Sequence, residues 1–215
     1  MDRIFDLPGK TLRKLGLLFV LLFVSNFVSA QLSDLHYLPP LKQGQNNAGI
    51  RDQAIYLSTP EPTTFLVNAY QGTNTTPVAT FNISNTAPAE WTLSDGDNNI
   101  ILVNNANTGV ALNNSGLRIE SPSGNRFYVN NRGNSSAQAA SLTAKGRQAL
   151  GTRFKWGGVP NLGAHPSKSN TLGIMATEDN TTVQLYGYDP GCEFRVGNDR
   201  AGITANTYTV TLDAH

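Results

Sequence analysis

The sequence predicts an all-β protein built as an antiparallel β-sandwich. Short stretches that alternate apolar and polar residues recur about every eight to twelve residues, as is typical of sandwiches and barrels. Between these stretches lie glycine, proline, asparagine and aspartate, which favour turns. Long stretches with helical periodicity are absent beyond residue 30, so we expect little helix there. The length fits one large sandwich or two packed β subdomains, and we favour two.

The first 30 residues have the features of a secretory signal peptide. Four basic residues precede an apolar run at residues 15–28, and small residues up to Ala30 offer a cleavage site before Gln31. A membrane anchor is the competing interpretation. It is disfavoured because two polar residues interrupt the run and leave it short of the ~20 residues that span a bilayer. We expect a mature chain that is secreted or placed at the cell surface.

Charge and cysteine content narrow the range of partners. The mature chain would carry 12 basic and 13 acidic residues, and this balance does not predict the concentrated basic surface that nucleic acid requires. No segment after residue 30 is apolar enough to span a membrane. Cys192 is the only cysteine, so no internal disulfide is expected. We interpret it as a half-buried small apolar residue; the alternative is a thiol that pairs with sequence beyond this chain.

The mature chain is expected to begin with a lead-in and a first β part. Residues 31–53 are predicted as an extended lead-in, because Pro39 and Pro40 disfavour helix and polar, turn-forming residues follow. Residues 54–145 form the first β part. Its predicted strands are 54–58, 64–70, 78–83, 90–93, 100–103, 110–112, 117–120, 126–130 and 136–142.

Residues 146–215 form the second β part. Its predicted strands are 153–156, 171–177, 181–188, 193–196 and 207–212. Strands 171–177 and 181–188 are expected to make a central hairpin, because Asp179 and Asn180 tolerate the positive φ of a hairpin turn. The single helix candidate, 139–150, is limited to one turn by Gly146, and its small residues fit a strand equally well. The final strand lies close to His215, so we expect a fragment of a longer protein.

Apolar residues of the predicted strands should be buried between the sheets. This predicted core includes Val78, Trp91, Phe154, Trp156 and Leu172. An aromatic side chain buries ~150 to 250 Å², so the two tryptophans are expected to be the most costly to truncate.

Two loops contain residues that could bind a metal ion. Asp95, Asp97 and Asn99 place oxygen atoms at alternate positions, as at the start of a calcium loop. The later positions of such a loop lack the required glycine and glutamate, so a hairpin turn is the favoured interpretation. The same interpretation applies to Glu178 and Asp179. We therefore predict no cofactor, with Ca²⁺ as the weaker alternative.

No set of residues with catalytic spacing is present. His36, His165 and His215 lie in predicted loops or at the chain end, where histidines are usually solvated. Cys192 is followed by an acidic residue, which does not favour a reactive thiolate. Paired carboxylates could support glycoside hydrolysis, and the available acids are Glu90, Glu120, Glu178 and Asp179. We predict that the protein is not an enzyme.

A family resemblance is carried by segments 38–41, 54–60, 141–146, 149–154 and, most specifically, 173–183, which contains Ala176-Thr177-Glu178-Asp179-Asn180-Thr181-Thr182. These segments resemble the N-terminal IgGFc-binding-type domain of large secreted proteins from gliding bacteria. The resemblance implies an extracellular all-β module at the front of a long adhesin-like, gliding-motility-associated protein. It also implies a C-terminal domain for type IX secretion beyond His215. It transfers no site residues.

These features predict a non-catalytic extracellular module for adhesion or interaction, at the N-terminus of a larger secreted or surface-attached bacterial protein. The expected partner is an extracellular glycan or protein. One alternative is an extracellular hydrolase, or an accessory binding domain, that acts on polysaccharide or protein. Another is a purely structural spacer. Loops on a rigid β scaffold favour the interaction module.

Overall fold

The computed structural model describes residues 31–42, 49–135, 138–158, 170–189, 191–197, 199–204 and 207–214. The predicted signal peptide with Ala30, together with His165 and His215, lies outside these residues. The described residues are organised by β-strands, and the only helices among them are the 3-10 turns η2 (Asn105–Asn107) and η3 (Gly146–Ala149). The all-β prediction is therefore confirmed. In the same residues, no helix is long and apolar enough to cross a membrane.

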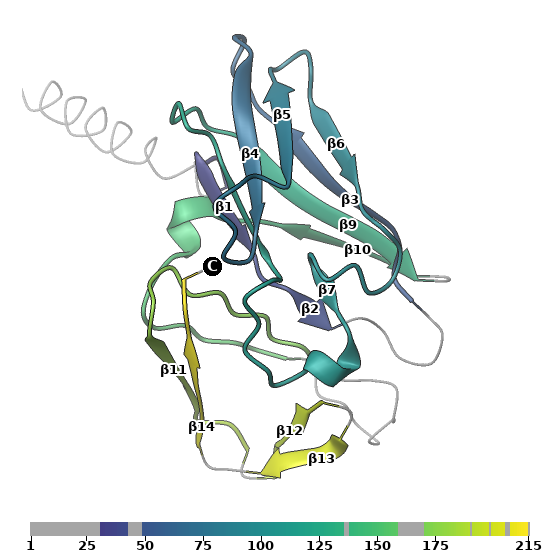
Figure 1. Cartoon of the computed structure of the whole chain (residues 1–215), viewed down its shortest axis with the longest axis vertical. Coiled ribbons are helices and arrows are strands. Elements are labelled where there is room, and N and C mark those ends of the chain that lie inside the picture. Colours follow the sequence, from purple (N-terminus) through teal and green to yellow (C-terminus); the bar gives the residue numbers. More distant parts are fainter. Residues whose placement is uncertain are drawn as a thin grey trace, which may run out of the picture. The chain divides into compact units, whose positions relative to one another are not determined.

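Two four-stranded antiparallel sheets form the sandwich (Figure 1). The first sheet has the order β1 (Leu35–Leu38), β8 (Leu117–Glu120), β4 (Phe65–Gln71) and β5 (Ala79–Ile83). The second has the order β10 (Gln138–Thr143), β9 (Tyr128–Ser135), β3 (Arg51–Ser58) and β6 (Ala89–Thr92).

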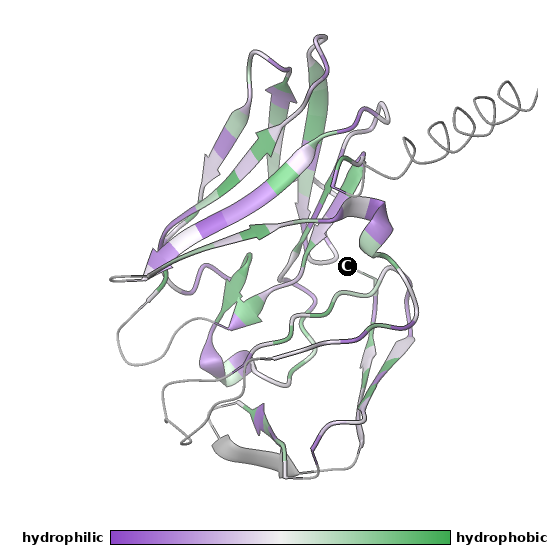
Figure 2. Ribbon diagram, turned by 180° about the vertical axis from the view of Figure 1, so that it is seen from behind, coloured by the Kyte–Doolittle hydropathy of each residue, from purple (hydrophilic) through white to green (hydrophobic). Residues whose placement is uncertain are grey.

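The core lies between these sheets because their strands alternate in polarity. Val67 of β4 and Ile119 of β8 meet Ile55 of β3 and Val129 of β9 in one buried cluster, and all four are fully buried. Phe127, which precedes β9, is also fully buried in this cluster. Along β9, Figure 2 shows hydrophobic residues at the start of the strand and hydrophilic residues over the remainder. The sandwich core thus covers only the first part of β9.

The predicted lead-in is a structural part of the sandwich. Leu35 and His36 of β1 are buried, and β1 pairs with β8 along its whole length. After Pro39 and Pro40 the chain forms β2 (Leu41–Lys42), which pairs in parallel with β7 (Leu102–Val103). The proline pair therefore separates two short strands, and does not mark a loose entry segment.

The C-terminal part contains two separate strand pairs. β11 (Thr181–Tyr186) pairs with β14 (Thr207–Leu212), and β12 (Glu193–Val196) pairs with β13 (Asp199–Thr204), both antiparallel. Half-buried and exposed residues alternate along β11 and β14, so each strand has one sheltered face. The ring of Phe194 stacks on Tyr208 with ring centroids 5.1 Å apart, which links the two pairs.

The predicted central hairpin is wrong. Residues 171–175 form no strand, and the partner of β11 is β14. Asn180 does adopt positive φ, at 56°, but the preceding segment turns away toward β2. A Cβ atom at Gly173 would lie only 2.6 Å from the Pro40 carbonyl oxygen, so this segment packs against the proline pair. Tertiary packing has overridden the local turn signal.

Two aspartates join the 178–180 turn to the end of β14. The Asp179 carboxylate accepts the Ala214 N–H at 3.0 Å, and the Asp213 carboxylate accepts the Asn180 N–H at 3.0 Å. We expect Asp179→Ala to lower the free energy of unfolding by about 1 kcal/mol, because a backbone donor loses its acceptor. Urea denaturation measures this change. Glu178→Ala is the matched control, and an equal loss in both variants would contradict the role of these hydrogen bonds.

Other elements also differ from the prediction. Residues 110–112 and 153–156 form no strand, and β13 was not predicted. Phe154 is 69% exposed and Trp156 is 54% exposed, and Val78 and Leu172 are also exposed, so these four core assignments are wrong. Trp91 is partly buried, with its ring 5.9 Å from that of Phe81, as expected for a core aromatic. Residues 139–150 divide into strand β10 and the single turn η3, as the small residues and Gly146 predicted.

Candidate functional site

The Asp95–Asn99 loop is held by its own side chains. The Asn98 side-chain oxygen accepts three successive backbone N–H groups, at residues 100–102, over 2.9 to 3.3 Å. Asn98 also donates to the buried Gln53 at 2.9 Å. The Asp95 carboxylate accepts the Asp52 N–H at 2.9 Å, and the Asn99 side-chain oxygen accepts from Ser115 at 3.1 Å. This loop is an asparagine-centred turn and not a hairpin, because β6 pairs with β3 and β7 pairs with β2.

The predicted metal ligands do not converge. Asp97 is exposed, and Asp179 binds the end of β14. No hydrogen bond between described residues joins the loops 95–99 and 178–180. Within the described ranges, no group of three or more His, Cys, Asp or Glu residues is arranged to hold a metal ion. The expectation of no cofactor, with Ca²⁺ as the weaker alternative, stays a prediction.

Asn98 is expected to be the most important residue of this loop. We expect Asn98→Ala to lower the free energy of unfolding by about 2 kcal/mol, because three backbone donors and Gln53 lose their partner. Chemical denaturation in the presence of a chelator measures the change. Asp97→Ala is the control and should lie within about 0.5 kcal/mol of the parent. An equal loss for Asp97→Ala, together with stabilisation by added Ca²⁺, would instead identify a metal site.

The carboxylates considered for catalysis have structural partners. Glu120 forms an ion pair with Arg118 at 2.5 Å, and Glu90 accepts from the Tyr56 hydroxyl at 3.4 Å. Glu120 lies on β8 of the first sheet and Glu90 on β6 of the second. Cys192 is a free cysteine and is half-buried. This burial agrees with the interpretation of Cys192 as a half-buried small apolar residue.

His36 is buried, so the expectation of a solvated histidine is wrong. Its Nε2 lies 2.9 Å from the Phe127 carbonyl oxygen and 3.2 Å from the Ser33 carbonyl oxygen. Both partners are acceptors, so Nε2 carries the proton. Nδ1 is buried without a hydrogen-bond partner. Burial lowers the pKa of His36, while the two carbonyl groups and the nearby Asp34 oppose this shift.

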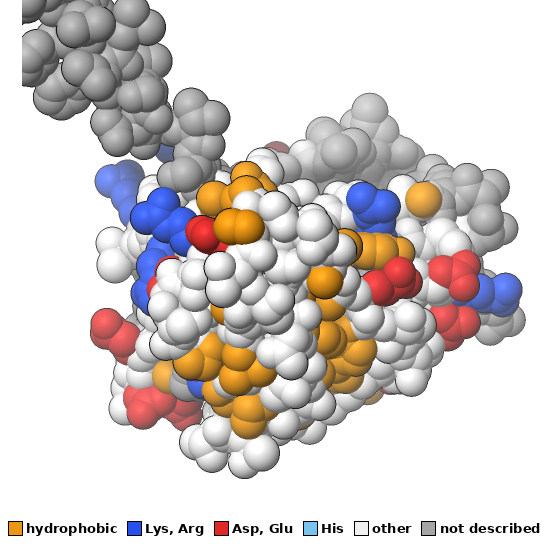
Figure 3. Space-filling model, turned by 90° about the horizontal axis from the view of Figure 1, so that it is seen from above, with side chains coloured by type: hydrophobic (Ala, Val, Ile, Leu, Met, Phe, Trp, Pro, Cys, Tyr) orange, Lys and Arg blue, Asp and Glu red, His pale blue; other side chains and the backbone are white. Residues whose placement is uncertain are grey.

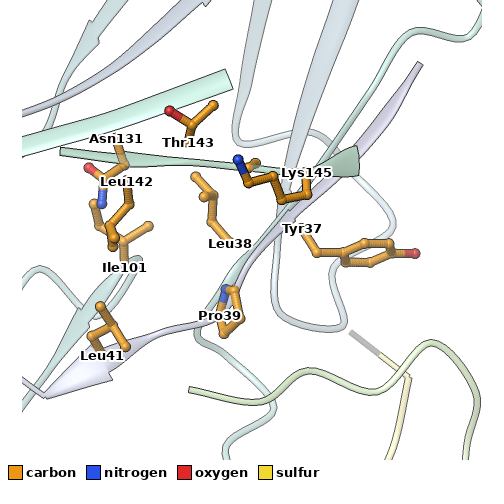
Figure 4. A pocket seen from close by; sticks show the side chains of 10 residues that line it. Tyr37, Leu38, Pro39, Leu41, Ile101, Asn131, Leu142, Thr143 and Lys145 are labelled. Carbon is orange, nitrogen blue, oxygen red and sulfur yellow. The ribbon is translucent and has the colours of Figure 1, made fainter. Parts of the chain in front are cut away.

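A hydrophobic hollow of about 240 Å³ opens between the β1–β2 segment and β10 (Figure 4). Figure 4 shows Leu38, Pro39 and Leu41 on one side of the hollow, and Asn131 and Leu142 on the other. The Asn131 side-chain oxygen is buried without a hydrogen-bond partner. The lining of the hollow is mainly apolar, and Leu38, Leu41 and Ile101 contribute to it. Sequence reasoning missed it, because its walls come from distant parts of the chain.

Three loops are linked at one end of the sandwich. The Asn85 N–H donates to the Glu61 carbonyl at 2.8 Å, and the Thr59 hydroxyl donates to the Arg126 carbonyl at 2.7 Å. These bonds join the loops that follow β3, β5 and β8. Figure 3 looks onto this end and shows hydrophobic side chains in the centre, with most charged side chains toward the margins. The hydrogen-bonded loops therefore present a surface with few charges at its centre.

The segment after β9 contains β10, the single turn η3 and the strand pairs β11–β14 and β12–β13. Residues 139–215 match the family model described as IgGFc binding protein. This match supports an IgGFc-binding-type domain in that part of the chain, and the family is one of binding modules rather than enzymes. Comparison with curated proteins and with solved structures gave no match.

The region that matches the family model, residues 139–215, begins inside the sandwich. Its first strand, β10, pairs with β9 over six residue positions. Next, Arg147 of η3 binds Asp34 in two hydrogen bonds of 2.7 and 2.9 Å, and this contact lowers the pKa of Asp34. The resembling segments 38–41 and 54–60 lie outside the matched residues. The sandwich thus holds the start of the matched region in place.

The matched region contains an exposed segment of alternating basic and aromatic residues. Arg153, Phe154, Lys155 and Trp156 follow η3, and all four side chains are exposed. In the described part of the chain, neither Arg153 nor Lys155 makes an ion pair or a hydrogen bond. We refer to residues 150–158 as the aromatic–basic segment. Sequence reasoning assigned its aromatic residues to the core, because it treated them as part of a strand.

Proposed function

We propose that this chain is a non-catalytic extracellular interaction module that binds a macromolecular ligand. The match of residues 139–215 to the IgGFc binding protein family carries this proposal, because the family consists of binding modules. The signal-peptide features of residues 1–30 support an extracellular location. Loops and an exposed aromatic–basic segment on a rigid β scaffold provide surfaces for a ligand.

The family description supports a protein ligand, and an extracellular glycan is the second class of ligand that we propose. We further propose that the chain is the N-terminal module of a larger secreted bacterial surface protein of the gliding-motility-associated, type IX class. The residues that resemble such modules, above all 173–183, support this context.

Binding of the processed chain to arrays of glycans, mucins and proteins, including immunoglobulin Fc, tests the proposed function. We expect saturable binding to at least one class, and a cell-adhesion defect when the chain is deleted from its host. Failure to bind on all of these arrays, with normal adhesion after deletion, would overturn the proposal. Turnover of polysaccharide or protein by the purified chain would favour a hydrolase instead.

A further inference from the structure

We propose that the aromatic–basic segment is a binding site for an anionic polysaccharide, whose charge comes from sulfate or carboxylate groups. This inference names the ligand class of the proposed interaction module and rests on that function. The distribution of charge along the chain, the exposure of two aromatic rings and the lack of partners for two cations support it.

Charge is strongly segregated in this nearly neutral chain. Between Glu120 and Glu178 the sequence contains seven basic residues and no acidic residue. The basic residues are Arg126, Arg132, Lys145, Arg147, Arg153, Lys155 and Lys168. The other residues beyond position 30 contain only five basic residues but all 13 acidic ones. An excess of basic residues in one stretch favours contact with a polyanion, even though the overall charge does not predict it.

Two arginines of the acid-free stretch make contacts within the protein. Arg147 binds Asp34, and Arg132 donates to Asn130 and lies over the ring of Tyr56 at 4.9 Å. Arg153 and Lys155 differ because they are exposed and unpaired among the described residues. Their charges are available to an external anion without the loss of an internal contact.

The two aromatic rings of the segment are exposed, and each lies close to a glycine of the same segment. A Cβ atom at Gly158 would lie 2.5 Å from Cη2 of Trp156, and one at Gly151 would lie 3.5 Å from Cζ of Phe154. The Trp156 ring therefore rests on backbone that only glycine leaves open, beside the side chain of Asn170. Contact with backbone limits ring motion, so less conformational entropy is lost on binding.

A polysaccharide fits these features better than a membrane does. The apolar C–H face of a sugar ring can stack on an aromatic ring while its charged groups meet nearby cations. Two rings and two cations offer little apolar area for insertion into a bilayer, where stable anchoring usually needs two signals. A polymer with repeated charges, in contrast, can contact Arg153 and Lys155 together while its sugar rings stack on the aromatic side chains.

Binding of heparin and hyaluronan to the processed chain, with dextran as the neutral control, tests the proposal. We expect both anionic polymers to bind and dextran not to bind at the same concentration. Phe154→Ala and Trp156→Ala should each weaken binding roughly three- to tenfold. Gly158→Ala should also weaken it, because the added methyl group displaces the Trp156 ring. Tyr186→Ala, which removes another exposed aromatic, is the control and should have no effect.

The charge contribution is tested by salt dependence. Arg153→Gln combined with Lys155→Gln should reduce the slope of log affinity against log salt by about two, since two counterion-releasing contacts are lost. Arg51→Gln, outside the acid-free stretch, should leave the slope unchanged. Circular dichroism of each variant checks that the fold is retained.

Three results would overturn the proposal. One is anionic polymer binding that none of the segment variants changes. Another is equal or tighter binding to phosphatidylserine vesicles or to single-stranded DNA with the same dependence on Trp156. The third is binding to protein ligands alone. That result would keep the proposed function as an interaction module and reject only anionic polysaccharide as its ligand class. Absence of every kind of binding would instead remove the proposed function itself.

Discussion

Phe127→Ala is expected to lower the free energy of unfolding by about 3 to 5 kcal/mol, the usual cost of removing a buried phenylalanine. Phe127 is fully buried. Its ring lies 4.8 Å from that of His36 and 6.5 Å from that of Phe65, measured between centroids. Truncation would leave a cavity where the first strand and both sheets meet, and close packing allows only partial collapse around it.

Phe154→Ala is the matched control for this prediction. The same side chain is removed, but Phe154 is 69% exposed, so the change should lie within about 0.5 kcal/mol. Urea denaturation followed by circular dichroism measures both variants. Similar losses for the two would mean that the aromatic–basic segment is packed in solution, which contradicts both the fold and the proposed binding site.

Stability should fall as the pH is lowered through the range where histidine titrates. The pKa of folded His36 is below its ordinary value of 6.5, because burial disfavours the imidazolium ion. The unfolded chain therefore binds a proton first as the pH falls, and this favours unfolding. The contribution of neutral His36 is complete above about pH 6.5 and is lost below it, at up to about 1.4 kcal/mol per pH unit.

His36→Gln separates this effect from other titrations. The variant should be about 2 to 4 kcal/mol less stable at pH 7.5, since it loses the packed ring and its hydrogen-bond geometry. Its stability should then change much less between pH 7.5 and 5.5 than that of the parent chain. Denaturation midpoints across this range provide the measurement. Parallel pH profiles for the parent and the variant would rule out His36 as the titrating group.

The aromatic–basic segment shows how whole-chain averages can conceal a site. A near balance of basic and acidic residues argued against nucleic acid as a partner, yet every acid after residue 30 lies outside the stretch between Glu120 and Glu178. Counting charge by segment finds this asymmetry from sequence alone. Exposure of Phe154 and Trp156 could not be found in this way, because an aromatic next to a basic residue also fits an edge strand.

Strands with strong local patterns were predicted close to their observed bounds. β5, β8 and β14 alternate apolar and polar residues between clear turn residues, and alternation requires no knowledge of the partner strand. The weak pattern of β1 was missed. His36 reads as polar in sequence, but the Ser33 and Phe127 carbonyls satisfy its N–H and permit its burial.

The sequence by itself determined the all-β class, most strands of the sandwich and the acid-free basic stretch, because periodicity, turn residues and charge are local properties of the chain. Only the tertiary structure decided that β11 pairs with β14, that His36 is buried and that Phe154 and Trp156 face solvent. Each of these outcomes depends on residues distant in sequence. The packing of Gly173 against Pro40 prevents the local hairpin, and the two sheets bury Phe65 and Phe127 but leave the aromatics of the segment after η3 uncovered.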